Sequence, residues 1–232
     1  MSLENNLKNK SKQNKKRGFF YNFCYDFVKI TGIIPALIWM RPKVYYPFGK
    51  PCKKGAIMVS ANHNTLFDPI VVQIPFPLRR VNCLATKDLF DTELKKQFFV
   101  QMHCIIVDKD NFSLASFHEV VNRLNEGKIV VIFPEGQLNH NSNESILAFK
   151  SGAVLMAHRA GAPIVPMYIV KPQKWYHRQH IVVGMPLNVS EMLGKMPSMQ
   201  DLNNANEILR QKEVELREYF ESLPVYKKMN QQ

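Results

Sequence analysis

Short apolar runs that alternate with helical segments constrain this chain most strongly. The runs are Ala56–Ser60, Val81–Thr86, Cys104–Val107, Ile129–Phe133, Ile164–Val170 and Ile181–Val183. Helical periodicity marks Leu66–Ile74, Asp88–Met102, residues 114–127, Ser151–Ala160 and a C-terminal stripe over residues 205–220. This alternation predicts an α/β fold with a central, mostly parallel sheet flanked by helices. Because the runs are apolar throughout, we expect helices on both faces of the sheet.

The chain divides into three segments of different character. Its 232 residues suit one compact domain, which we place at residues 44–232. Residues 1–18 hold six basic side chains and one glutamate, a local net charge of +5, and predict a disordered basic tail. Residues 19–43 lie between the tail and the domain and are mostly apolar.

Residues 19–43 predict two amphipathic helices. Phe20, Phe23, Phe27 and Ile30 fall at helical spacing and predict the first helix. A second short helix is predicted around Ile33–Met40, and Gly32 and Pro35 interrupt a continuous helix over the whole segment. Asp26 and Lys29 would each cost about 2.5–3.5 kcal/mol at a bilayer centre. The segment is therefore predicted to lie in a membrane interface, rather than to span the bilayer or act as a secretory signal. The alternative is an ordinary helix packed on the core.

The net charge of +12 indicates an anionic partner, which could be nucleic acid, acidic lipid, a phosphorylated substrate or an acidic carrier protein. The sequence has no RNA-recognition signature, so nucleic acid is not expected. Four dispersed cysteines without C-x-x-C favour neither a disulfide framework nor a zinc site, and they suggest a reducing, cytoplasmic environment. His177 and His180 lack further ligands nearby, so no metal is predicted.

A histidine and an aspartate lie five positions apart, directly after an apolar run, as His63 and Asp68. A hydroxyl that acts as a nucleophile needs a base, because a neutral hydroxyl is a poor nucleophile, and the pKa of histidine suits that role. A carboxylate bonded to the far ring nitrogen fixes the tautomer. We predict that His63 is the general base and that Asp68 orients it. The alternative is a surface histidine followed by an aspartate that caps a helix ahead of Pro69.

The order of several motifs resembles the glycerolipid acyltransferase family. They are Asn62-His63-x-Thr65-x-x-Asp68, Thr86-Lys87-Asp88-Leu89-Phe90, residues 104–109, Phe133-Pro134-Glu135-Gly136, residues 149–153 and residues 162–166. The resemblance covers roughly residues 50–170 and the amphipathic N-terminal segment. It implies a glycerol-3-phosphate acyltransferase-like fold. It also implies a reaction in which the histidine takes a proton from a hydroxyl that attacks an acyl thioester.

Phe133-Pro134-Glu135-Gly136 follows a predicted strand, where ligands bind in open α/β sheets. Glu135 can accept hydrogen bonds from acceptor hydroxyls, and Gly136 allows close approach of a backbone amide. Both are predicted substrate-binding residues, as is Asn62 by its place in the motif. The alternative is a tight turn, which proline and glycine alone would explain.

The chain departs from the family pattern at the phosphate-binding positions. Gly136 is followed by Gln137-Leu138 rather than Thr-Arg, Lys109 stands where arginine is usual, and His103 where glycine is frequent. The family arginines are thought to hold the acceptor's phosphate bidentately, whereas lysine is a point charge. Lys87 and Lys109 are candidates to hold a phosphate, or else are solvated surface charges.

The resemblance implies transfer of a fatty acyl group from acyl-CoA or acyl-acyl carrier protein to 1-acyl-sn-glycerol 3-phosphate, making phosphatidic acid without a cofactor. The expected partners are an anionic bilayer, the thioester donor and a lysophospholipid acceptor. The expected location is the cytoplasmic face of the cell membrane, as a peripheral or monotopic protein. One alternative is the same chemistry on another lipid or alcohol. The other is a non-catalytic protein that binds membranes or nucleic acid.

Overall fold

The structure is a computed structural model that describes residues 21–51, 54–89, 91–108, 113–139, 146–150, 152–172 and 178–229. Within these ranges, seven strands form one sheet in the order β1-β7-β6-β2-β5-β3-β4. The strands are β1 Lys43–Tyr45, β2 Ile57–Ala61, β3 Val81–Thr86, β4 Ile105–Val107, β5 Ile129–Ile132, β6 Ile164–Ile169 and β7 His180–Val183. Neighbouring strands are parallel except β6 and β7. The predicted α/β fold with a mostly parallel central sheet is confirmed.

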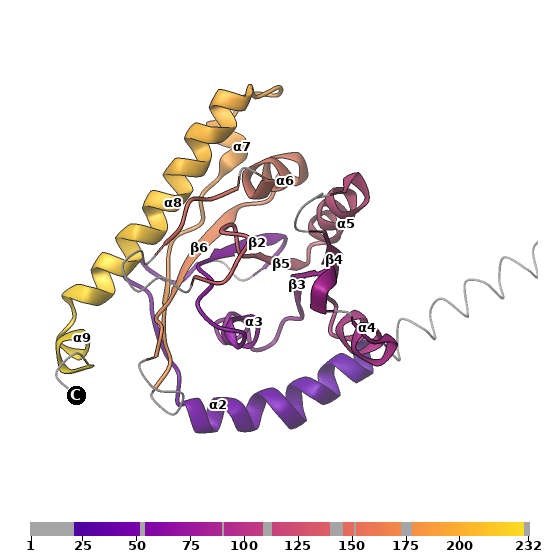
Figure 1. The fold of residues 1–232 in the computed structure, drawn as a ribbon. Coiled ribbons are helices and arrows are strands. Elements are labelled where there is room, and N and C mark those ends of the chain that lie inside the picture. Colours follow the sequence, from indigo (N-terminus) through magenta and orange to yellow (C-terminus); the bar gives the residue numbers. More distant parts are fainter. Residues whose placement is uncertain are drawn as a thin grey trace, which may run out of the picture.

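Helices cover both faces of the sheet (Figure 1). One face packs against α5 Leu114–Asn125, α6 Gly152–Ala160, α7 Val189–Met192 and α8 Met199–Ser222. The other face packs against α3 Asp68–Val71 and the end of a long N-terminal helix, Tyr21–Met40. Successive residues of β2 serve opposite faces: Met58 packs in the first core, and Ile57 and Val59 in the second. An apolar run without alternation is therefore what this central strand requires.

The strand predictions hold to within one residue at each end. β3 has the predicted bounds, Val81–Thr86. The sequence analysis missed β1, because three residues at the edge of the sheet, paired with β7 alone, carry too little pattern. It also missed α7 and the final helix, α9 Pro224–Met229.

Two predicted helices are shorter than expected. The helix predicted over Leu66–Ile74 is reduced to α3, because the Asp68 carboxylate binds the preceding main-chain N–H groups and holds that segment in a turn. The helix predicted over Asp88–Met102 is divided into a 3-10 turn, η2 Lys87–Leu89, and α4 Glu93–Gln101. Thr92 starts α4 by accepting a hydrogen bond from the N–H of Lys95, which is the usual role of an N-cap.

The two helices predicted in residues 19–43 join into one, with residues 1–20 outside the described ranges. A π-helical turn, η1 Lys29–Ile33, connects residues 21–28 to α2 Ile34–Met40. In this turn the N–H of Ile34 bonds to the carbonyl of Lys29. Pro35, which has no N–H to donate, follows without ending the helix.

The N-terminal helix docks on the domain through its polar and ring-bearing side chains. Tyr25 is buried and bonds to Gln73 (2.9 Å), and its hydroxyl accepts the N–H of Val81 (3.0 Å). Asp26 pairs with Arg80 (Oδ2 to Nη2, 2.6 Å), and the Lys29 ammonium donates to the carbonyl of Arg79 (2.8 Å). His103, at a φ of 59°, packs its ring between Tyr21 and Tyr25, at centroid distances of 4.3 and 4.7 Å.

Candidate active site

The predicted site residues lie at the carboxyl ends of neighbouring strands. β2 ends directly before Asn62 and His63, β5 ends before Phe133, and β3 ends before Lys87. β2 pairs with β5, and β5 pairs with β3, all in parallel, so these ends share one edge of the sheet. The topology therefore places His63 next to the Phe133–Gly136 turn, with Lys87 one strand farther away.

His63 and Asp68 are in direct contact. The Nδ1 atom of His63 lies 2.9 Å from Oδ2 of Asp68. A carboxylate only accepts, so in a neutral ring Nδ1 carries the proton and Nε2 keeps its lone pair. The His63 side chain is 18% exposed and that of Asp68 is 2% exposed, so the histidine ring reaches solvent while the carboxylate does not.

The Asp68 carboxylate is held by several donors besides the histidine. Oδ2 accepts the N–H groups of Asn64 (2.6 Å) and Thr65 (2.8 Å), and Oδ1 accepts the Thr65 hydroxyl (2.8 Å). Burial of an ionised carboxylate is costly unless hydrogen bonds replace its water, and these bonds do so. The turn between His63 and Asp68 is thus built around the carboxylate, which fixes the direction of the ring.

The segment after β5 surrounds His63 on its other sides. The ring of Phe133 stacks on the imidazole, with centroids 4.1 Å apart and planes at 19°. The N–H of His63 donates to Oε1 of Glu135 (3.2 Å), and its carbonyl accepts the N–H of Asn139 (2.7 Å). Ring and main chain of the histidine are both fixed before any substrate arrives, which is the preorganisation that a general base needs.

Glu135 is buried and faces the main chain of His63. Burial raises the pKa of Glu135, and the hydrogen bonds it accepts from the N–H groups of His63 and Leu147 oppose this in part. Its second oxygen, Oε2, is buried without a hydrogen-bond partner. That Glu135 binds acceptor hydroxyls stays a prediction; its contact in the structure is with the main chain of His63.

The prediction that Asn62 contacts substrate is wrong, because its side chain is fully buried and both its oxygen and its nitrogen are bonded to the main chain of Ile169. Its amide group donates to the carbonyl of Ile169 (3.0 Å) and accepts the N–H of the same residue (2.7 Å). Asn64, which the sequence analysis did not single out, donates to the same carbonyl (2.9 Å). Both asparagines tie the histidine turn to the end of β6.

Comparison with known proteins identifies the family of the chain. Residues 41–170 match the sequence model of a family described as Acyltransferase. The chain belongs to the acyltransferase family. It is therefore an O-acyltransferase, which excludes the non-catalytic alternative. The Thermotoga maritima 1-acyl-sn-glycerophosphate acyltransferase PlsC has a similar fold, with a TM-score of 0.59 and 17% identity, covering 91% of this chain and 84% of that one.

Two curated relatives extend the comparison. The 1-acyl-sn-glycerol-3-phosphate acyltransferase of Bacillus subtilis is 26% identical over 208 residues, covering 88% of this chain and 100% of that protein. A probable 1-acyl-sn-glycerol-3-phosphate acyltransferase of Mycoplasma pneumoniae is 28% identical over 151 residues, covering 62% of this chain and 56% of that protein. The acyltransferase thus spans the whole Bacillus relative and about half of the Mycoplasma one.

Of the predicted substrate-binding residues in this acyltransferase, Lys87 is paired and Lys109 lies outside the described residues. The Lys87 ammonium bonds to Oδ2 of Asp108 (3.1 Å), although 64% of the lysine side chain is exposed. Gly136 is exposed with a φ of +70°, and its own N–H bonds to the carbonyl of Phe133 (3.0 Å). That amide is therefore already used inside the turn.

A buried acid behind the site escaped the sequence analysis. Glu213 of α8 has no exposed surface, and it accepts a hydrogen bond from Ser60 of β2 (2.6 Å). Burial, with the nearby Glu135 charge, raises the pKa of Glu213 well above its usual range, while the Ser60 bond acts against the shift. In a helix with many charged residues, the sequence alone predicts that a glutamate lies at the surface. Only the packing of α8 on β2 shows that Glu213 is buried. Among the described residues, no three His, Cys, Asp or Glu side chains are grouped so as to hold a metal ion.

Proposed function

We propose that this acyltransferase moves a fatty acyl group from a thioester to the free hydroxyl of 1-acyl-sn-glycerol 3-phosphate, making phosphatidic acid. The observation that carries the proposal is the buried Asp68 carboxylate bonded to a solvent-reaching His63. The Bacillus relative, matched over its whole length, bears the name of this activity. The donor is an acyl thioester of coenzyme A or of acyl carrier protein.

The reaction needs one base and no redox group. Nε2 of His63 takes the proton of the acceptor hydroxyl, and the oxygen attacks the thioester carbonyl carbon. The new C–O bond forms, the C–S bond breaks, and the imidazolium returns its proton to the thiolate. Asp68 stabilises the imidazolium in between. No serine nucleophile is involved, because the substrate hydroxyl takes that place, and we propose that no cofactor takes part.

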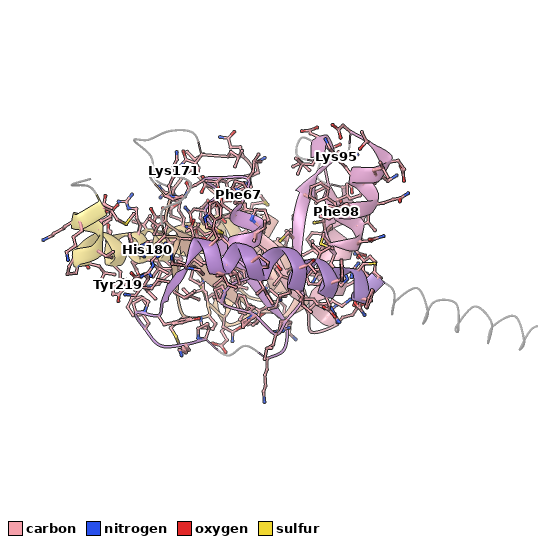
Figure 2. All side chains as sticks on the ribbon, turned by 90° about the horizontal axis from the view of Figure 1, so that it is seen from below. Phe67, Lys95, Phe98, Lys171, His180 and Tyr219 are labelled. Atoms are coloured by element: carbon pink, nitrogen blue, oxygen red, sulfur yellow. The ribbon has the colours of Figure 1, made fainter. Side chains whose placement is uncertain are left out.

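The enzyme is proposed to work at a membrane through the outer face of its N-terminal helix. Phe23, Phe27, Ile30, Ile34, Ile38 and Trp39 are each 46–73% exposed. Figure 2 looks onto this helix, which crosses the molecule, with Phe67 and Phe98 along one side of it in that view. Phe67, next to Asp68 in the chain, is 63% exposed. An apolar face of this kind suits the interfacial region of a bilayer.

Length and composition alone would let Tyr21–Met40 cross a membrane, which is weak support for a span. We propose the interfacial arrangement, because Asp26 and Lys29 bond to the domain near the middle of the helix. Crossing would require these charges to leave Arg80 and the Arg79 carbonyl for hydrocarbon, at about 2.5–3.5 kcal/mol each. The helix would therefore lie along the cytoplasmic face of an anionic membrane.

Replacing His63 tests the proposed base. His63→Ala should lower turnover with lysophosphatidic acid by about 10²–10⁴-fold, the usual contribution of a general base, while a thermal melt shows that the variant is still folded. Turnover is measured with radiolabelled acyl-CoA and, separately, acyl-acyl carrier protein, which also identifies the donor. A matched control is His118→Ala on α5, which should turn over like the native protein. A His63→Ala variant with native turnover would contradict the mechanism.

A second acceptor remains a candidate, because Gln137 and Leu138 replace the Thr-Arg pair usual in the family. Lys87, the nearest described candidate for phosphate, is also paired with Asp108. The test is an acceptor panel of lysophosphatidic acid, monoacylglycerol, lysophosphatidylcholine and a long-chain alcohol. Reaction with another acceptor while lysophosphatidic acid stays inert would replace the first proposal.

A further inference from the structure

Lys150 lies against the turn that holds His63. A Cβ atom added to Gly136 would lie 2.9 Å from Cε and 3.0 Å from Nζ of Lys150, so the lysine side chain crosses directly over the glycine. The N–H of Lys150 donates to the carbonyl of Pro134 (2.9 Å). Both the main chain and the side chain of this lysine therefore follow the Phe133–Gly136 turn.

The position of Lys150 is fixed from a second side. The preceding carbonyl, of Phe149, accepts a hydrogen bond from the side-chain amide of Asn206 on α8 (2.9 Å). The main chain at residues 149–150 is thus held between α8 and the Phe133–Gly136 turn. The lysine is a positioned cation rather than one on a free loop.

The Lys150 ammonium has no ion pair or hydrogen bond to any residue that the structure describes. Glu135 is the acid of this turn, yet its Oε2 atom is buried without a partner, while Lys150 is exposed. The carboxylate is therefore buried, whereas the lysine is open to solvent. The Lys150 ammonium therefore leaves a positive charge beside the Phe133–Gly136 turn, in which Glu135 binds the main chain of His63.

The other described cations at this edge of the sheet are less suited. Lys87 is compensated by Asp108. Lys171 follows β6, on the opposite side of β2 from the Phe133–Gly136 turn. A phosphate carries up to two negative charges, and an ammonium with three donors binds it without requiring a planar fork.

We infer that Lys150 binds the phosphate of the acyl acceptor, and that Gly136 leaves the room for it; the inference rests on the proposed function. The contacts make the two residues a unit, because any side chain at residue 136 would displace the lysine. In this arrangement the acceptor lies between Nε2 of His63, which takes the hydroxyl proton, and Nζ of Lys150, which holds the phosphate. The turn connecting Glu135 to Gly136 sets their separation.

The test compares acceptors with and without phosphate in detergent micelles of fixed composition. Lys150→Met should raise the KM for lysophosphatidic acid about ten- to hundredfold, the range of a charge-assisted hydrogen bond, and leave kcat within about twofold. The KM for monoacylglycerol should not change. Lys150→Arg, which keeps the charge, should restore most of the affinity for lysophosphatidic acid. Lys195→Met, an exposed lysine after α7, is the matched control and should behave like the native protein.

The kinetic results distinguish a wrong function from a wrong role for Lys150. A native enzyme that does not acylate lysophosphatidic acid overturns the proposed function itself. A native enzyme that does so, combined with a Lys150→Met variant of unchanged KM, overturns only the role of Lys150. An equal loss with both acceptors also overturns it, since the lysine would then support the fold of the turn. If Lys171→Met, rather than Lys150→Met, raised the KM for lysophosphatidic acid alone, the phosphate site would have to lie on the other side of His63.

Discussion

The N-terminal helix and α8 are the two long helices of the described chain, and they turn opposite faces toward the protein: α8 its apolar face and the N-terminal helix its polar face. α8 buries apolar side chains, such as Leu209 and Phe220, and turns ion pairs outward, among them Arg210–Glu207 and Lys212–Glu215. The N-terminal helix turns Asp26 and Lys29 toward the domain and leaves Phe27 and Ile30 outside. The first pattern suits water, and the second suits an apolar medium.

The difference shows that amphipathicity alone does not tell where a helix belongs. Both sequences have one apolar and one polar face, and only the docking contacts reveal which face is turned to the protein. For the N-terminal helix, Tyr25, Asp26 and Lys29 decide the orientation, because each is bonded to the segment Gln73–Val81. The active site lies on the domain that this helix would hold at a membrane.

The largest expected effect is on membrane binding. Phe27→Ser combined with Ile30→Ser should weaken binding to anionic vesicles by about a hundredfold, since each inserted apolar side chain contributes about 1.5–3 kcal/mol as an upper bound. Co-sedimentation with vesicles containing phosphatidylglycerol measures the affinity. Ile208→Ser, at a 41% exposed position of α8, is the matched control and should bind normally. Equal losses of vesicle affinity in both variants would contradict the proposed difference between the two helices.

The next effect concerns the buried acid of α8. The folded-state pKa of Glu213 is raised, so its stabilising contribution is complete below the unfolded value near 4.5 and is lost as pH rises toward the folded value. Glu213→Gln cannot ionise. Its free energy of unfolding relative to the native protein should therefore rise between about pH 6 and pH 7, by at most about 1.4 kcal/mol. Denaturant melts measure it. Glu207→Gln, on the exposed face, should show no such trend; a trend equal in both would contradict the buried, neutral acid.

The smallest effect concerns the docking ion pair. Asp26 and Arg80 are 45% and 42% exposed, so Asp26→Asn should lower the free energy of unfolding by only about 0.2–1 kcal/mol. Thermal melts without vesicles measure this. Glu215→Gln removes an ion pair of similar exposure from α8 and should cost about as much. A loss several times larger for Asp26→Asn would mean that this pair, rather than Tyr25 and His103, holds the helix down.

The strands could be predicted closely because continuous apolar runs have few other uses in a chain of this length. β3 was bounded correctly, and the other predicted strands differ by one residue. The helix boundaries failed where one side chain overrides local propensity. Asp68 binds the N–H groups before it and shortens α3, and a π turn carries the N-terminal helix past Pro35.

Much of the site could also be predicted, since the His63–Asp68 contact spans only five positions. Asn62 was misassigned because its partner, Ile169, is 107 residues away. Glu213 and Lys150 were not assigned for the same reason: Ser60 lies 153 residues from Glu213, and the Asn206 that anchors Phe149 lies 57 residues away. Local patterns identify reactive groups, whereas the groups that position them come from segments that only the fold brings together.

The π turn at Lys29–Ile33 adds one residue to an otherwise regular helix. Each residue of an α-helix advances the chain by about 100°, and the wider π turn takes up the extra residue with a smaller advance per residue. Loss of a single residue from this turn would let it close as ordinary α-helix, and Ile34 and Ile38 would stay on nearly the same side as Phe23 and Phe27. A one-residue deletion should therefore be tolerated within this turn, whereas one elsewhere in the helix would rotate one part of the exposed apolar face away from the other.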